Sequence, residues 1–241
     1  MKNLVLVGGA GGIGRSLAVR AFDEGWEVTV MDLEKSLIKH PPKKGIETRN
    51  IDLKDHLSIS KAFAGFKSLS GLVNLAGFMH GLNSLENTTN EEFDEVMSVN
   101  FRGAFIVAKE ALPLLKLRGG SMVNVVSGLA SNVRPNYGVY GASKAGLINL
   151  TKTLALEAAP KVRVNAVGPS AVDTAFLRGG TGRSTENEPL TLDIENYTKI
   201  TPLARIAEPD DIVGPIMFLL GPDSKFMTGQ TLWVNGGGFM P

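Results

Sequence analysis

Short apolar runs alternate with longer amphipathic stretches from one end of the chain to the other. Seven runs rich in aliphatic and β-branched residues predict strands, at residues 3–7, 26–31, 45–51, 71–75, 121–126, 162–167 and 231–234. Helical periodicity fills the intervals 13–24, 57–66, 91–117, 142–158 and 209–220. Apolar strands separated by helices form parallel sheets that helices cover on both faces. The sequence therefore predicts an α/β fold with a doubly wound, seven-stranded parallel sheet.

The alternation continues without a linker, a repeat or a low-complexity tract, so residues 1–241 are expected to form a single domain. One long segment, residues 175–200, has neither a strand pattern nor a helical pattern. It contains Gly179, Gly180 and Gly182, followed by a polar stretch. Irregular segments of this length in a compact domain are often lids over a site, and we expect a substrate lid here.

Composition argues against several functional classes. The 25 Lys and Arg residues nearly balance the 24 Asp and Glu residues, for a net charge of +1, which disfavours a nucleic-acid or anionic-membrane partner. The chain has no cysteine, and its three histidines are far apart in sequence, so we expect no metal site. The N-terminus lacks a secretory pattern, and no apolar run is as long as a membrane span, so we expect a cytoplasmic protein.

A glycine-rich turn, VGGAGGIG at residues 7–14, lies between the first predicted strand and the first predicted helix. Two spacings fit it: Gly9, Gly11 and Gly14, or Gly8, Gly12 and Gly14. Either allows backbone to approach a pyrophosphate at a helix N-terminus. Asp32 ends the second strand, where a carboxylate can accept hydrogen bonds from adenosine-ribose hydroxyls. This order indicates a dinucleotide site; the alternative is a turn that binds nothing, with Asp32 a surface acid.

Tyr140 and Lys144 are four residues apart in a predicted helix, so their side chains share one face. A phenol is a poor acid or base at neutral pH unless a nearby cation stabilises the phenolate. Ser127 follows the fifth strand, at the end of a sheet where ligands bind, and its hydroxyl would lie beside the same reacting oxygen. Spacing alone leaves a second reading open, in which the pair is an ordinary contact on the helix surface.

Together these motifs resemble the short-chain dehydrogenase/reductase family over residues 3–239. VGGAGGIG is similar to the family's T-G-x-x-x-G-x-G turn and favours the spacing with Gly8. NLAG at 74–77 is similar to N-N-A-G, and PSAVDT at 169–174 to P-G-x-V-x-T. YGASK at 140–144 matches Y-x-x-x-K, and Asn100 in SVNFRGAF matches the family's helix asparagine. TPLARIAEPDDI and MTGQTLWVNGGG resemble a typical family ending.

The resemblance implies a Rossmann fold and a division of roles among the catalytic residues. Tyr140 would be the general acid in carbonyl reduction and the base in alcohol oxidation. Lys144 would lower the pKa of Tyr140 and bind the nicotinamide ribose. Ser127 would hold the substrate oxygen, and Asn100 would support a proton relay through water.

The resemblance also assigns a set of cofactor-binding residues, which come from loops throughout the chain. They are Gly8, Gly11, Gly12, Ile13, Gly14, Asp32, Leu33, Asp52, Leu53, Asn74, Ala76, Gly77, Tyr140, Lys144, Pro169, Val172 and Thr174. The cofactor expected is NAD, because Asp32 would repel the 2′-phosphate of NADP and because Gly11 and Leu33 occupy the two positions at which the family places a phosphate-binding cation.

The chain departs from the family pattern at four positions. Val7 replaces the turn threonine, Leu75 replaces the second asparagine of N-N-A-G, Ser170 replaces a glycine, and Asn235 stands where aspartate is usual. None of these changes removes a proton-transfer group. They alter local bracing, and Ser170 lies near the expected nicotinamide site.

The leading hypothesis is an NAD(H)-linked enzyme that acts on a small secondary alcohol or ketone. Specificity would come from Phe78, Met79, residues 129–137 and the lid. The lid carries three basic and four acidic residues and so does not favour an anionic substrate. Two alternatives are a 3-oxoacyl thioester (acyl carrier protein) reductase using NADPH and a dinucleotide-binding regulatory protein without turnover. Family resemblance further implies a homo-oligomer, a dimer or a homotetramer, in which helices 91–117 and 142–158 pair between subunits.

Overall fold

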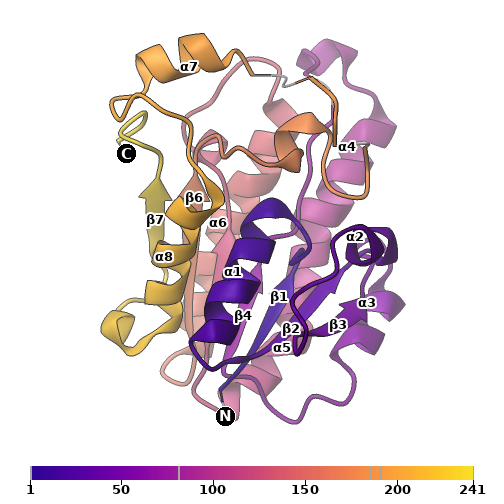
Figure 1. Ribbon diagram of the computed structural model, residues 1–241, viewed down its shortest axis with the longest axis vertical. Coiled ribbons are helices and arrows are strands. Elements are labelled where there is room, and N and C mark those ends of the chain that lie inside the picture. Colours follow the sequence, from indigo (N-terminus) through magenta and orange to yellow (C-terminus); the bar gives the residue numbers. More distant parts are fainter. Residues whose placement is uncertain (1, 81, 185, 190–191, 241) are drawn as a thin grey trace.

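A seven-stranded, fully parallel sheet forms the centre of the molecule, in the order β3-β2-β1-β4-β5-β6-β7. The computed structural model describes residues 2–80, 82–184, 186–189 and 192–240. The strands are β1 Asn3–Val7, β2 Glu27–Asp32, β3 Glu47–Asn50, β4 Gly71–Asn74, β5 Ser121–Val125, β6 Arg163–Pro169 and β7 Thr231–Val234. The predicted α/β, doubly wound fold is confirmed (Figure 1).

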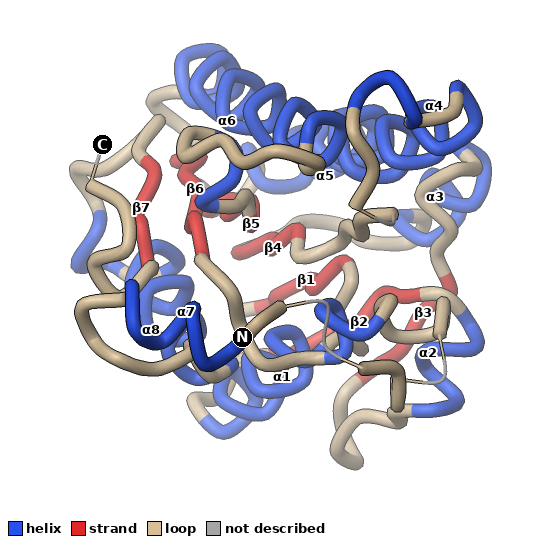
Figure 2. The backbone as a smooth tube through the Cα atoms, turned by 90° about the horizontal axis from the view of Figure 1, so that it is seen from above, coloured by secondary structure: helices blue, strands red, loops and turns tan. Residues whose placement is uncertain are grey.

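Helices cover both faces of this sheet (Figure 2). One face carries α3 His56–Phe63, α4 Asn90–Met97, α5 Ala104–Lys116 and α6 Gly138–Ala158. The other carries α1 Gly12–Asp23, α2 Glu34–Lys39 and α8 Pro209–Leu220. A further short helix, α7 Ile194–Ile200, lies above the carboxyl edge of the sheet.

The inner strands are buried on both faces because their side chains alternate between two cores, whereas the edge strands β3 and β7 are partly exposed. In β1, Val5 and Val7 join the core under α3, α5 and α6, whereas Leu4 and Leu6 join the core under α1 and α8. All four are fully buried. An uninterrupted apolar strand of this kind is stable only between two helical layers, which explains why the short apolar runs of the sequence become the interior of a parallel sheet.

Three local features differ from the prediction. Helix α2 was not predicted, because its six residues give too little periodicity to recognise. The predicted helix 91–117 is divided: a π-helical turn, Ser98–Gly103, separates α4 from α5. Inside the predicted irregular segment 175–200, the structure has a 3₁₀ turn at Ala175–Arg178 and helix α7.

Side-chain caps explain the order in that last segment. The Thr174 hydroxyl accepts a hydrogen bond from the Phe176 N–H at the start of the 3₁₀ turn, at 3.3 Å. Asp193 accepts one from the Asn196 N–H at the start of α7, at 3.0 Å. Such caps satisfy N–H groups that a helix leaves unpaired, and they make short helices possible where apolar periodicity is weak.

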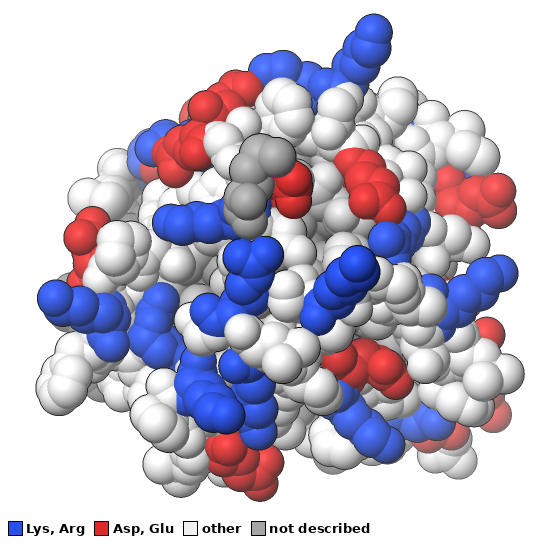
Figure 3. All heavy atoms as spheres, turned by 90° about the horizontal axis from the view of Figure 1, so that it is seen from below, with Lys and Arg blue, Asp and Glu red and all other residues white. Residues whose placement is uncertain are grey.

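All strands run in one direction, so their carboxyl ends, and the loops that follow them, meet at one edge of the sheet (Figure 1). At the opposite edge, Lys and Arg side chains gather with Asp and Glu side chains among them (Figure 3). Every helix within the described residues is too short or too polar to cross a bilayer. In the same part of the chain, no three His, Asp or Glu side chains are grouped so that they could hold a metal ion.

Candidate active site

A pocket of about 530 Å³ opens at the carboxyl edge of the sheet, across the point between β1 and β4 where the strand order reverses. In doubly wound sheets, ligands bind at this switch point. The structure brings nearly all of the predicted site residues to this pocket. Those that line it are Gly8, Gly11, Gly12, Ile13, Gly14, Asp32, Leu33, Asp52, Leu53, Ala76, Gly77, Ser127, Tyr140, Lys144, Pro169, Val172 and Thr174. Asn74 and Asn100 do not line it.

The glycine-rich turn is packed so closely that larger residues would not fit. Gly8 has φ of +79°, and a Cβ there would lie 2.7 Å from the Ala76 nitrogen. A Cβ on Gly14 would lie 2.6 Å from the Gly9 Cα, and one on Gly12 would collide with the Thr174 side chain. The glycines therefore let β1, the loop after β4 and the loop after β6 approach one another around a backbone cradle.

The first helix begins in this cradle without a side-chain cap. Gly11 precedes α1 and has no side chain to accept hydrogen bonds from the first N–H groups of the helix. Its first turn, from Gly12 to Gly14, carries no acidic residue and lines the pocket. Unpaired N–H groups and the positive end of the helix dipole favour an anion at this position, so the cradle fits the pyrophosphate of a dinucleotide.

Asp32 lies at the end of β2, beside this turn. Its carboxylate accepts hydrogen bonds from the backbone N–H groups of Ala10, at 3.0 Å, and Leu33, at 2.8 Å. Burial raises the pKa of Asp32, while these two hydrogen bonds and the Ser36 hydroxyl act in the opposite direction. The side chain is thus fixed by the turn that it borders, and Asp32 lines the pocket.

Two of the predicted catalytic residues, Tyr140 and Ser127, have hydroxyl groups that lie near each other. Tyr140 and Ser127 are both buried, and the Ser127 hydroxyl is close enough to Tyr140 to influence its pKa. The ring of Phe176, at the start of the lid segment, packs 5.8 Å from the Tyr140 ring, centroid to centroid. Burial raises the pKa of Tyr140 to about 12, although the Ser127 hydroxyl acts in the opposite direction.

Lys144 is fully inside the protein, and its Nζ donates to the Val125 carbonyl at 3.0 Å. Burial lowers the pKa of Lys144 to about 8. Its Nζ lies 5.9 Å from the centre of the Tyr140 ring. Desolvation is the largest influence on the phenol, and the expected lowering of the pKa of Tyr140 by Lys144 stays a prediction.

Asn100 lies in the π-helical turn and supports the pocket wall rather than forming it. Its amide donates to the Phe78 carbonyl at 2.8 Å and accepts from the Phe78 N–H at 3.0 Å. It also donates to the Ser143 hydroxyl at 3.2 Å, which connects it to α6. Asn74 has a similar local role, because its side chain accepts a hydrogen bond from the Ala76 N–H at 3.2 Å.

The C-terminal segment also lines the pocket, which sequence reasoning missed. Asn235, Gly238 and Phe239 all border it. The Asn235 amide donates to the Phe239 carbonyl at 2.6 Å and accepts from the Gly237 N–H at 3.0 Å. A carboxylate could not donate the first of these bonds, so the departure from aspartate at this position has a structural reason. The glycine run at 236–238 was the available sequence signal for a tight turn at the site.

The outer part of the pocket is mostly apolar. Phe78, Met79, Leu129, Tyr137 and Phe176 contribute to its wall, as predicted for the segments after β4 and β5 and for the lid. Tyr197 of α7 completes the wall. Apolar walls with a few polar groups at one end are typical of small-molecule sites.

Comparisons with known proteins agree with this geometry. Residues 8–238 match the family described as Enoyl-(Acyl carrier protein) reductase. The 3-oxoacyl-(acyl-carrier-protein) reductase FabG of Staphylococcus epidermidis is 32% identical over 253 residues, which cover 99% of both chains. A Brucella melitensis structure described as short-chain dehydrogenase/reductase SDR:glucose/ribitol dehydrogenase superposes with a TM-score of 0.88, at 29% identity, covering 100% of this chain and 97% of the other. The chain belongs to the short-chain dehydrogenase/reductase family.

A second solved structure relates the pocket to its cofactor class. The 3-ketoacyl-(acyl-carrier-protein) reductase of Brucella melitensis complexed with NADH has a TM-score of 0.87 and 28% identity, covering 99% of this chain and 98% of the other. The protein is accordingly an oxidoreductase that acts on CH–OH or keto groups of a small molecule with a nicotinamide dinucleotide.

Two glycines with nearly the same backbone conformation test the cradle. Gly8 and Gly25 have φ of +79° and +84°, but a Cβ on Gly25 would meet nothing within 4 Å. Gly8→Ala and Gly25→Ala should each lose about 1 kcal/mol of unfolding free energy from the left-handed conformation. Only Gly8→Ala must also displace Ala76, so it alone should weaken NADH binding, by at least about tenfold.

Fluorescence titration with NADH and urea unfolding would separate the two effects. Equal NADH affinity in the two variants would show that the close approach of Gly8 to Ala76 does not shape the dinucleotide site.

Proposed function

We propose that the protein is an NAD(H)-linked dehydrogenase/reductase that interconverts a ketone and a secondary alcohol, with Tyr140 as the general acid/base. The observation that carries this proposal is that Ser127, Tyr140 and Lys144, all buried, line the same pocket as the glycine-rich cradle. A carbonyl oxygen placed against the two hydroxyls would accept hydrogen bonds from both. The cofactor, when bound, supplies the hydride, and the protein supplies the proton.

The electrostatics of the site favour carbonyl reduction. A general acid must hold its proton at working pH, and burial raises the pKa of Tyr140 to about 12. Lys144, with its pKa lowered to about 8, still carries its charge at neutral pH and lies against the Val125 carbonyl at the floor of the pocket. Alcohol oxidation needs the phenolate instead, so it should be favoured as the pH rises.

The remaining roles follow the family resemblance. For Asn100 the resemblance implies support of a proton relay through water; because it also holds the backbone of Phe78 on the pocket wall, we propose that it acts as a positioning residue as well. The cradle and the loops after β2, β3, β4 and β6 would bind the cofactor through the residues named above. Val172 and Thr174 would flank the nicotinamide, and Asp52 and Leu53 would lie at the adenine.

The cofactor proposed is NAD(H). The Asp32 carboxylate is fixed by Ala10 and Leu33, where both ribose hydroxyls of an adenosine could donate to it. Like unit charges 4 Å apart repel by about 4 kcal/mol at an effective dielectric of 20, which opposes a 2′-phosphate. The NADH complex of the similar Brucella reductase shows that a related reductase takes NADH.

A 3-oxoacyl thioester is the second candidate substrate class. The curated relatives aligned over nearly the whole chain at 32% identity are 3-oxoacyl-(acyl-carrier-protein) reductases. Such a substrate would place its keto group at Tyr140 and its thioester toward the apolar outer wall. A regulatory protein without turnover is the contrasting candidate, and the buried Tyr140–Ser127 pair beside Lys144 disfavours it, because a binding role needs no such groups.

We further propose one domain, a cytoplasmic location and assembly as a dimer or tetramer. Large apolar side chains exposed on α4, α5 and α6 support the assembly, namely Phe93, Phe105 and Leu156. These helices lie side by side along one flank of the sheet (Figure 2), where the resemblance puts a subunit interface.

Replacement of Tyr140 by Phe tests the proton transfer. Tyr140→Phe removes one hydroxyl from a buried ring, so folding and NADH affinity should be retained while kcat for ketone reduction falls by at least about a hundredfold. Tyr137→Phe is the matched control, since Tyr137 lines the same pocket, and its loss should be at least about tenfold smaller. Comparable kcat values for wild type and Tyr140→Phe would contradict the assignment.

The pH dependence of alcohol oxidation gives an independent check. Because the phenolate is the active form and the pKa of Tyr140 lies far above neutrality, its fraction increases about tenfold per pH unit. Between about pH 6 and pH 8, kcat/KM for oxidation should therefore rise with pH, while reduction stays nearly level. A level profile for oxidation would mean that another group takes the proton.

Cofactor choice is tested by steady-state kinetics with both cofactors. Wild-type enzyme should prefer NADH by at least about tenfold in kcat/KM, less than the full Coulomb repulsion because Arg15 and Lys35 lie nearby in sequence. Asp32→Ala should reduce the difference in kcat/KM between NADH and NADPH, mainly by lowering kcat/KM with NADH. Equal use of NADPH by the wild type would refute the NAD(H) proposal.

A further inference from the structure

Part of the lid segment reaches far beyond the reacting end of the pocket. We call residues 179–186 the clasp; all of them except residue 185 belong to the described structure. The clasp follows Arg178, whose guanidinium is held by Asp173 at 2.9 Å and by the Thr174 carbonyl at 3.2 Å. From there it runs down toward α2 (Figure 1), and so it extends to the side of the pocket where Asp32 lies.

The clasp packs directly on α2. The Ser36 hydroxyl, which is fully buried, donates to the Thr181 carbonyl at 3.4 Å. Gly182 has φ of +68°, and a Cβ there would collide with the Ser36 hydroxyl and lie 3.2 Å from the Lys35 Cγ. Both the backbone conformation and the closeness of this contact require glycine, so the approach of the clasp to α2 is a specific feature of this sequence.

Glu186 fixes the far end of the clasp to the last residues of α2. Its carboxylate lies 3.1 Å from the Lys39 Nζ and 3.0 Å from the His40 Nε2. The Glu186 side chain is only 13% exposed. Burial acts to raise its pKa, but the contacts with Lys39 and His40 outweigh burial and lower it, so Glu186 is ionised at neutral pH.

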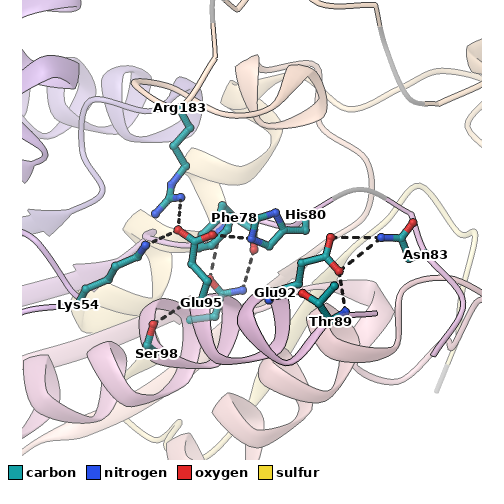
Figure 4. Close-up of polar contacts among 10 residues, drawn as sticks. Lys54, Phe78, His80, Asn83, Thr89, Glu92, Glu95, Ser98 and Arg183 are labelled. Carbon is teal, nitrogen blue, oxygen red and sulfur yellow. Dashed lines mark hydrogen bonds and ion pairs between the residues drawn. The ribbon is translucent and has the colours of Figure 1, made fainter. Parts of the chain in front are cut away.

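On the opposite side of the pocket, Arg183 anchors the clasp. Its guanidinium lies 3.6 Å above the centre of the Phe78 ring and 3.3 Å from Glu95. Lys54 and His80 bind the same carboxylate, and Figure 4 shows the three side chains converging on it. Hydrogen bonds from Lys54, His80 and Arg183 lower the pKa of Glu95 to about 2, against the opposing effect of burial. The clasp is therefore held on both walls of the pocket.

Its middle forms part of the adenosine end of the pocket. Gly180 and Thr181 line the same cavity as Asp32 and Leu33. The Ser36 hydroxyl interacts with Asp32 as well as with the clasp, and His40 is near enough to influence Asp32 electrostatically. The Asp32 carboxylate and the Lys39 and His40 side chains at the end of α2 thus lie in one neighbourhood, and Glu186 adds a second carboxylate to it.

We propose that Glu186 is a specificity-determining residue for the cofactor: by pairing with Lys39 and His40, it withholds from the adenosine site two side chains that could bind a 2′-phosphate. Asp32 repels such a phosphate. Positive charge nearby would offset this repulsion, and Glu186 neutralises that charge. The lid thus contributes to the discrimination between NAD(H) and NADP(H) through its contact with α2, in addition to the contribution of Asp32 at the end of β2. This inference rests on the proposed dinucleotide site and deepens the NAD(H) preference proposed for it.

The test uses two adenosine probes that need no turnover, 5′-AMP and adenosine 2′,5′-bisphosphate, titrated calorimetrically into the full chain. The readout is the ratio of their affinities. Glu186→Gln keeps the shape of the side chain and removes its charge, so the ratio should move toward the bisphosphate by about fivefold, the contribution of one partly exposed ion pair. In the double variant Glu186→Gln/Lys39→Met, most of this shift toward the bisphosphate should be lost.

Two control variants separate this charge effect from others. Glu195→Gln removes a lid carboxylate that pairs with Lys199 on α7, away from α2, and should leave the ratio unchanged. Arg183→Met breaks the other anchor of the clasp but leaves the Glu186 carboxylate beside Lys39 and His40, so it should not reproduce the shift. Thermal unfolding of each variant verifies that it is folded.

A shift in Glu186→Gln that disappears with Lys39→Met supports the inference. An unchanged ratio in folded Glu186→Gln overturns it, as does an equal shift in Arg183→Met, which would mean that opening the clasp is sufficient. Failure of the proposed function has a different signature: NADH oxidation would then be absent with every carbonyl substrate, whatever the adenosine probes show.

Discussion

The parallel alignment of the strands is the constraint on which the site depends. Because all seven strands point the same way, a glycine turn, an acid, a serine and two loops with no sequence proximity reach the same edge. The order of the strands reverses between β1 and β4. Beside the crevice at this point, backbone segments pack closely against one another. Gly8 against Ala76 and Gly14 against Gly9 make that packing possible, since any side chain would force the layers apart.

Burial then sets the chemistry available in this crevice. It moves the pKa of Tyr140 up and that of Lys144 down, so at neutral pH the site holds a protonated phenol beside an ammonium. That combination suits donation of a proton to a carbonyl oxygen. The ammonium is tolerated in the interior because the Val125 carbonyl accepts a hydrogen bond from it, which places the cation at a position fixed by β5 rather than by Tyr140 itself.

Sequence reasoning predicted the sheet and the glycine turn, because apolar strands and glycines between a strand and a helix are strong local patterns. The spacing of Tyr140 and Lys144 left a surface contact open, and only the family resemblance placed these residues with Ser127 at the pocket that they line. Sequence reasoning did not predict the π-helical turn at Asn100, since a single extra residue per turn leaves apolar periodicity almost unchanged. The contacts of the clasp could not be predicted from the sequence either. Its contacts join residues as far apart in sequence as His40 and Glu186, which are separated by 146 positions. No local sequence pattern around either residue indicates that the two are in contact.

Transfer of deuterium from NADH labelled at C4 of the nicotinamide is the most direct measurement of whether this pocket performs carbonyl reduction. The labelled cofactor would be incubated with a panel of ketones and 3-oxoacyl thioesters, and the products analysed by mass spectrometry. At least one substrate should yield an alcohol that carries deuterium on the former carbonyl carbon. Tight NADH binding without deuterium in any product would contradict the enzymatic function and favour a dinucleotide-binding protein without turnover.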